Sequence, residues 1–105
     1  MDEKLYIIVR KDLPYGAQFA QAVHAVAEFA IEHNDLYRDW HSTTNTVVVL
    51  NVKDETELLK IQQLSIENGI AHSLFKEPDY SGAATSIALK SKKTKFLNRL
   101  KLASL

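Results

Sequence analysis

The strongest constraint on the fold is an apolar strand followed closely by an apolar helix. Residues 5–10 read LYIIVR, with apolar side chains on both faces, which is typical of a central strand covered on both sides. A loop from Lys11 to Gly16 follows, and residues 15–34 then predict one alanine-rich helix that is apolar almost all the way round. Since both elements need cover from further layers, the sequence predicts an α/β protein.

One narrow polar stripe crosses this predicted helix. Gln21, His24 and Glu28 stand at i, i+3 and i+7, which places the three side chains on a single face. In α/β proteins ligands usually bind where a strand ends and the next helix begins. The stripe is therefore the first candidate for a functional site.

The rest of the chain predicts three more strands and two more helices. In order they are a strand at 45–52, a helix at 54–69, an edge strand at 70–75, a loop at 76–82, a strand at 84–89 and a short basic helix at 94–102. Strand–helix–strand connections favour parallel pairing, whereas the short last loop favours one antiparallel strand. This β-α-β-α-β-β order predicts a three-layer sandwich, with a small mixed four-stranded sheet between helices.

Length and composition predict one domain over residues 1–105. With no cysteine in the chain, no disulfide, thiol nucleophile or thiolate metal site is expected. No apolar run approaches the about 18 residues that a membrane span needs, and the acidic N-terminus is unlike a signal peptide. We expect a cytoplasmic protein without a membrane partner.

The charges are unevenly distributed although the net charge is zero. Six of the 13 basic residues and no acid lie in a basic C-terminal segment, residues 90–105. This asymmetry predicts an anionic partner such as nucleic acid. The alternative is a solvated tail that folds against the acidic remainder of the chain.

Few kinds of chemistry fit the residues that are present. Three scattered glycines exclude a phosphate-binding glycine loop, and the four histidines lack the spacing of a zinc site, so neither a metal nor a cofactor is expected. A histidine beside a carboxylate can accept a proton from water, although the spacing alone favours His24 as a core histidine bonded to a backbone carbonyl. The candidate site residues are Asp12, Gln21, His24, Glu77, Asp79 and Thr85.

Three segments carry a family resemblance. Residues 7–13 read IIVRKDL, residues 19–25 read FAQAVHA, and Gly82 precedes TSIAL at residues 85–89. In this order and spacing they resemble the type-two peptidyl-tRNA hydrolases, over roughly residues 4–90. The matching positions are Arg10, Asp12, Leu13, Ala20, Gln21, His24, Ala25, Thr85, Ile87 and Ala88.

The resemblance implies hydrolysis of the ester between a peptide and the 3′ end of tRNA, without a metal or cofactor, often by a homodimer. It implies that Gln21 and His24 position the 3′ end and the ester. Asp79 or Glu77 would polarise water, with Thr85 as a hydrogen-bond partner. Substrate contacts are expected from Arg10, Lys11, Asp12 and Glu77.

Two departures from the family pattern suggest a divergent bacterial or phage-like branch. Ala17 stands where the family has a lysine, four residues before the glutamine, and the late loop is a short Glu77-Pro78-Asp79 sequence. The loss of the lysine leaves a second hypothesis open, a catalytically inactive homologue that binds tRNA or a small ligand. A third hypothesis is a dimeric structural protein whose apolar first helix forms the subunit interface.

Overall fold

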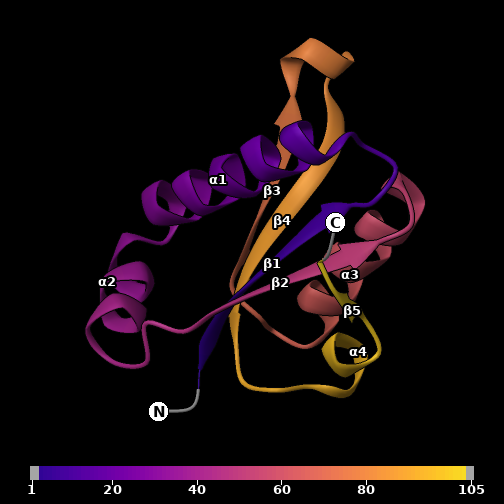
Figure 1. The fold of residues 1–105 in the computed structure, drawn as a ribbon. Helices are drawn as coiled ribbons and strands as arrows, with labels where there is room; N and C mark the ends of the chain where they lie inside the picture. Colours follow the sequence, from indigo (N-terminus) through magenta and orange to yellow (C-terminus); the bar gives the residue numbers. More distant parts are fainter. Residues whose placement is uncertain (1–2, 104–105) are drawn as a thin grey trace.

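The computed structural model describes residues 3–103. Its centre is a mixed sheet with strand order β3-β4-β1-β2-β5 (Figure 1). The strands are β1 (Lys4–Arg10), β2 (Val47–Val52), β3 (His72–Glu77), β4 (Ala83–Ser91) and β5 (Lys101–Leu102). The helices are α1 (Tyr15–Glu32), α2 (Asn34–Ser42), α3 (Glu55–Glu67), α4 (Lys95–Asn98) and the 3-10 turn η1 (Pro78–Tyr80).

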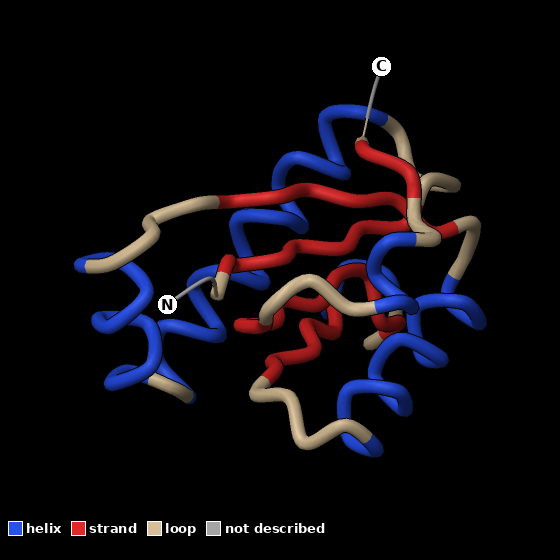
Figure 2. The backbone as a smooth tube through the Cα atoms, turned by 90° about the horizontal axis from the view of Figure 1, so that it is seen from below, coloured by secondary structure: helices blue, strands red, loops and turns tan. Residues whose placement is uncertain are grey.

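The sheet lies between two layers of helices, as predicted (Figure 2). Strand β1 alternates between the two cores because successive side chains of a strand point to opposite faces. Leu5, Ile7 and Val9 pack with α1 and α2, in a core that also holds Phe29. Tyr6 and Ile8 pack on the opposite face, with the buried side chains of α3 and α4. This arrangement confirms the predicted three-layer α/β sandwich.

The pairing of the strands also follows the prediction. Strand β1 is parallel to β2, and α1 and α2 form the crossover between them. Strand β4 lies between β1 and β3 and is antiparallel to both. The predicted third strand lies at an edge of the sheet. The mixed sheet and its antiparallel last long strand are therefore confirmed.

The sequence predicts four strands and a helix at 94–102, and both details are wrong. The helix is only α4, whose first turn is capped by the Thr94 hydroxyl accepting from Leu97 N–H at 3.3 Å. The chain then forms β5, which pairs antiparallel with β2. Two residues are too short to show a strand period, and they pair here because the edge of β2 offers unpaired backbone groups.

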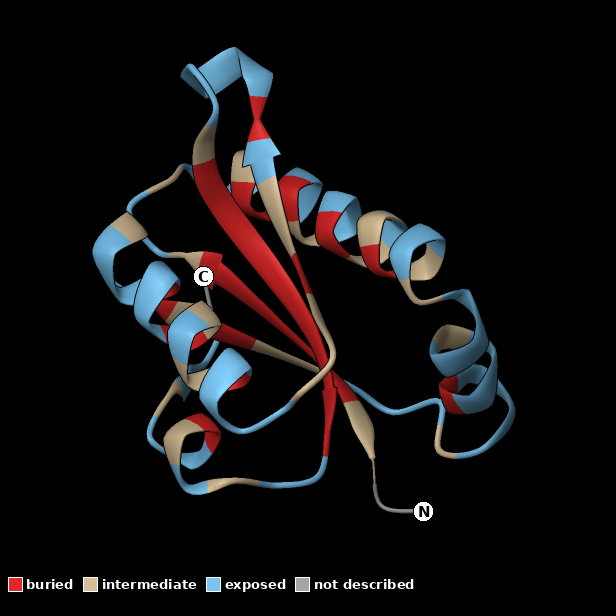
Figure 3. Ribbon diagram, turned by 180° about the vertical axis from the view of Figure 1, so that it is seen from behind, coloured by how far each residue is buried: buried red, intermediate tan, exposed pale blue. Residues whose placement is uncertain are grey.

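Helix α1 is shorter and more exposed than predicted. It ends at Glu32, and α2 begins after a break at His33. Four large apolar side chains of α1 face outward, with exposed fractions of 55% for Tyr15, 63% for Phe19, 68% for Val23 and 80% for Ile31 (Figure 3). A helix lying on a sheet buries one stripe only, and alanines on several sides kept the sequence pattern from showing which stripe that is. No helix within residues 3–103 is long and apolar enough to cross a membrane.

Candidate active site

Gln21 lies at the centre of a buried polar network under α1. Its Nε2 donates to Glu77 Oε1 at 2.8 Å, and its Oε1 accepts from the Thr85 hydroxyl at 2.5 Å. The Ser86 hydroxyl donates to the backbone carbonyl of Gln21 at 2.7 Å. Because a carboxylate only accepts and an amide nitrogen only donates, these partners fix the orientation of the Gln21 side chain. The network joins α1 to β3 and β4.

Glu77 is the buried acid of this network and the last residue of β3. Besides Gln21, its carboxylate accepts from Asp79 N–H at 3.2 Å, which caps η1. The Gln21 hydrogen bond, then the Asp79 N–H and the nearby His24 lower the pKa of Glu77 below its usual value, against a smaller opposing effect of burial. The carboxylate is therefore charged at neutral pH and acts as an acceptor.

His24 is the exposed member of the cluster. It lies one turn after Gln21 on α1, and 49% of its side chain is exposed. Its ring stacks on Phe75 with centroids 4.6 Å apart, and its Nε2 lies 3.9 Å from Glu77 Oε1. No backbone carbonyl within residues 3–103 holds it, so the core-histidine interpretation does not fit. A solvent-facing imidazole oriented by an aromatic ring and a carboxylate can accept a proton from water.

Arg10 and Asp12 form a separate pair at the end of β1. Arg10 donates from Nε and Nη2 to the two carboxylate oxygens of Asp12, at 3.0 and 2.8 Å, and from Nη1 to the Ala84 carbonyl at 3.1 Å. This two-point bond lowers the pKa of Asp12 and raises that of Arg10. No hydrogen bond or ion pair joins Asp12 to the Glu77 loop in the described residues. The pair instead fixes the loop that follows β1.

The remaining predicted residues lie outside the Gln21 network. The Asp79 side chain is exposed in η1, and only its backbone N–H reaches Glu77. Lys11 is exposed and lines a cavity near β2. Two members of the cluster, Phe75 and Ser86, were not among the candidates. The adjacent hydroxyls of Thr85 and Ser86, within the mostly apolar residues 83–89 of β4, were the available signal for Ser86.

No metal centre is formed by the part of the chain that the structure describes. Within residues 3–103, no group of three His, Asp or Glu side chains is close enough to hold an ion.

Comparison with solved structures supports the fold. A protein of unknown function from Agrobacterium tumefaciens strain C58 superposes with a TM-score of 0.73. The match covers 99% of both chains at 19% sequence identity. At this level of identity the likeness shows the fold alone.

Comparison with protein families is more informative. No curated protein matches the chain. The family described as peptidyl-tRNA hydrolase PTH2 matches residues 3–102, which includes the Gln21 network, His24 and the short β5 strand. The chain belongs to the PTH2 family of peptidyl-tRNA hydrolases.

Proposed function

We propose that this protein hydrolyses the ester bond between a peptidyl group and the 3′ end of tRNA. The observation that carries the proposal is the half-exposed His24 held beside the buried Gln21–Glu77–Thr85 network. Membership of the PTH2 family supports the same activity. In this proposal the partner is peptidyl-tRNA and the compartment is the cytoplasm, where translation takes place.

The geometry supports a division of roles. His24 accepts a proton from a water molecule whose oxygen attacks the ester carbonyl carbon, and the imidazole then returns the proton to the 3′ oxygen as the C–O bond breaks. Glu77 stabilises the protonated ring by its charge. Gln21 and Thr85 are too buried to reach the ester, so they act as positioning residues that hold the Glu77 carboxylate toward His24.

Exposed groups around the cluster are assigned to substrate contact. Asp79 lies in η1, between β3 and β4, and this hairpin extends beyond the start of α1 (Figure 1). Lys11 is assigned to a phosphate of the tRNA, since binding to RNA backbones depends mainly on such charge contacts. Arg10 and Asp12 hold the loop that carries Lys11.

Single-turnover release of the acyl group from a labelled N-acetylaminoacyl-tRNA tests the proposal. His24→Ala should slow release about 10²- to 10⁴-fold, as expected for loss of a general base. Gln21→Ala should also slow release, because it removes the hydrogen bond that holds the Glu77 carboxylate. Glu77→Gln should slow it because it removes the negative charge beside His24. Gln63→Ala, on the exposed side of α3, is the matched control and should release at the wild-type rate.

Folding of each variant is checked by thermal melting, because removal of Gln21 leaves two buried polar partners unsatisfied, at about 1–3 kcal/mol. Wild-type rates in both His24→Ala and Gln21→Ala would contradict the assigned roles.

Ala17 favours a second candidate function, a binding module that holds tRNA without hydrolysing it. Ala17 stands on α1 one turn before Gln21, where the family resemblance implies a lysine. Under this hypothesis the wild type binds tRNA but releases no acyl group, and Ala17→Lys gains release. Release by the wild type rejects it.

A further inference from the structure

A cavity of about 550 Å³ lies at the carboxyl ends of β1 and β2, apart from the Gln21 network. The chain leaves β1 for α1 on one face of the sheet and leaves β2 for α3 on the other (Figures 1 and 3). When two neighbouring parallel strands continue into helices on opposite faces of the sheet, a crevice forms between their carboxyl ends. Ligands of open α/β sheets bind in such crevices. The topology therefore marks this cavity as a candidate binding site in its own right.

The cavity is lined by four cations: Lys11, Lys53, Arg99 and Lys101. None of them forms an ion pair with a carboxylate among residues 3–103. The two acids in the lining are already engaged. Asp12 is held by Arg10, and Glu57 accepts from the backbone N–H of Lys53 at 2.6 Å. Glu57 keeps its own negative charge, so the lining holds four cations against one carboxylate without a cationic partner among residues 3–103, and this surplus of positive charge attracts an anion.

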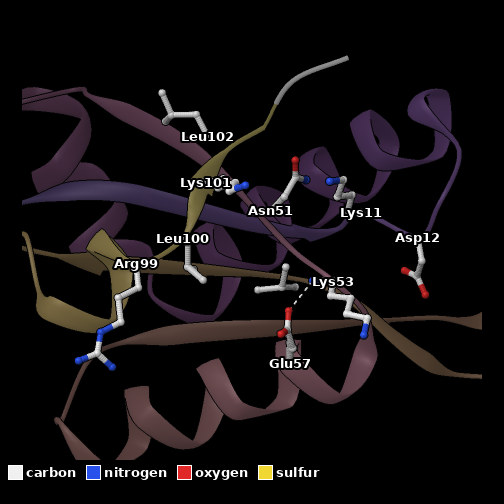
Figure 4. Close-up of a pocket in the computed structure, with 10 residues that line it drawn as sticks. Lys11, Asp12, Asn51, Lys53, Glu57, Arg99, Leu100, Lys101 and Leu102 are labelled. Atoms are coloured by element: carbon white, nitrogen blue, oxygen red, sulfur yellow. Dashed lines mark hydrogen bonds between the residues drawn. The ribbon is translucent and has the colours of Figure 1, made fainter.

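An amide stands between two of these ammonium groups. Asn51 of β2 is paired with Val9 of β1 and with Lys101 of β5, and Lys11 follows Val9 by two residues. The side chains of Lys11, Asn51 and Lys101 therefore form a row on one face of the sheet. Figure 4 shows Asn51 between Lys11 and Lys101. Its Nδ2 donates to Gln18 Oε1 at 3.2 Å, while its Oδ1 accepts no hydrogen bond from residues 3–103. The row thus offers two cations for a phosphate and one acceptor for a hydroxyl.

Asn51 also connects this cavity to the candidate active site. Its partner Gln18 lies three residues before Gln21 on α1, or about 4.5 Å along the helix axis. The cavity and the Gln21 network therefore flank the same half of α1. A ribonucleotide chain in contact with one of them can reach the other.

We propose that this cavity binds the phosphate and ribose hydroxyl of a ribonucleotide, through the lysines and Asn51 respectively. The source that the geometry favours is the backbone near the 3′ end of the tRNA, and this part rests on the proposed function. The same chemistry is offered by a free ribonucleotide, which the experiment distinguishes.

The test compares two double variants with the same change of charge. Lys11→Gln/Lys101→Gln removes the two cavity cations beside Asn51, and Lys92→Gln/Lys93→Gln removes two exposed lysines that do not line the cavity. The probe is a fluorescent RNA hairpin with a single-stranded 3′ end, titrated by anisotropy at several salt concentrations. The cavity variant should bind about fivefold or more weakly and lose roughly 1.5 from the salt slope, as expected for two lost phosphate contacts. The control should change less than about twofold, since its lysines touch no phosphate in this proposal.

Further probes identify the ligand. The cavity variant is also titrated with adenosine 5′-monophosphate. If it loses this binding but keeps its RNA affinity, the site exists and its ligand is a free nucleotide. Equal affinity for a DNA hairpin of the same sequence would overturn the ribose contact, because DNA lacks the 2′-hydroxyl. Equal weakening in both double variants, or no weakening toward either probe, would overturn the proposal.

Failure of this proposal and failure of the proposed function are separable. If the wild type releases no acyl group but the cavity variant loses RNA affinity, hydrolysis is rejected and the ribonucleotide site stands. If release is normal and the affinity of the cavity variant is unchanged, only the cavity proposal is rejected.

Discussion

Glu77 links the chemistry of the site to the stability of the fold. Its pKa is lowered, chiefly by the Gln21 hydrogen bond, so its charged form is the one that stabilises the native state. This contribution is complete above the ordinary glutamate value of 4.5. It is lost as the pH falls below that value and passes through the lower native pKa.

We predict that Glu77→Gln destabilises the protein at neutral pH and that the difference from wild type shrinks below about pH 4.5. Urea unfolding of both proteins between pH 3 and 7 measures it. A difference that stays constant over this range would contradict the assigned cause of the pKa shift.

At the scale of elements, the start of α3 supports one wall of the cavity. Asp54 is the N-cap and accepts from Glu57 N–H at 3.1 Å, and the Glu57 side chain accepts from the N–H of Lys53, one residue before the cap, at 2.6 Å. We predict that Asp54→Ala lowers the free energy of unfolding by about 1 kcal/mol, a typical loss for an N-cap. Urea denaturation measures this, with Thr56→Ala in the exposed first turn as the control. Equal losses in the two variants would show that the cap contributes nothing.

The exposed face of α1 belongs to the scale of the whole molecule. The outward face of α1 carries an uncharged stripe formed by Tyr15, Phe19, Val23 and Ile31. Exposed apolar patches of this kind mark sites where another protein surface binds. We predict that a second copy covers it, since a two-fold interface pairs the same surface of both subunits. Light scattering should give a dimer mass for the wild type and a monomer mass for Phe19→Lys/Val23→Lys.

The control for this prediction is Leu59→Lys/Ile66→Lys, which places the same two charges on the exposed side of α3 and should leave the dimer intact. A wild type that is monomeric at micromolar concentration would contradict the predicted dimer.

The sequence by itself determined the four long strands, the helices α1 and α3, and the layers. Strand β1 is apolar on both faces and α1 is rich in alanine. The spacing of apolar residues along an element indicates whether it is a strand or a helix and how many of its faces are covered. The polar stripe on α1 likewise marked Gln21 and His24 as candidates. A periodicity does not report which other strand lies beside a residue, so it could not detect the two-residue strand β5.

The tertiary structure decided which distant side chains meet. The sequence left Glu77 and Asp79 as equal candidates, but only the Glu77 carboxylate faces Gln21, which lies 56 residues earlier in the chain. The row of Lys11, Asn51 and Lys101 exists only through the register of three neighbouring strands. Such contacts depend on sheet order and register, which arise from packing of the whole chain rather than from any local pattern.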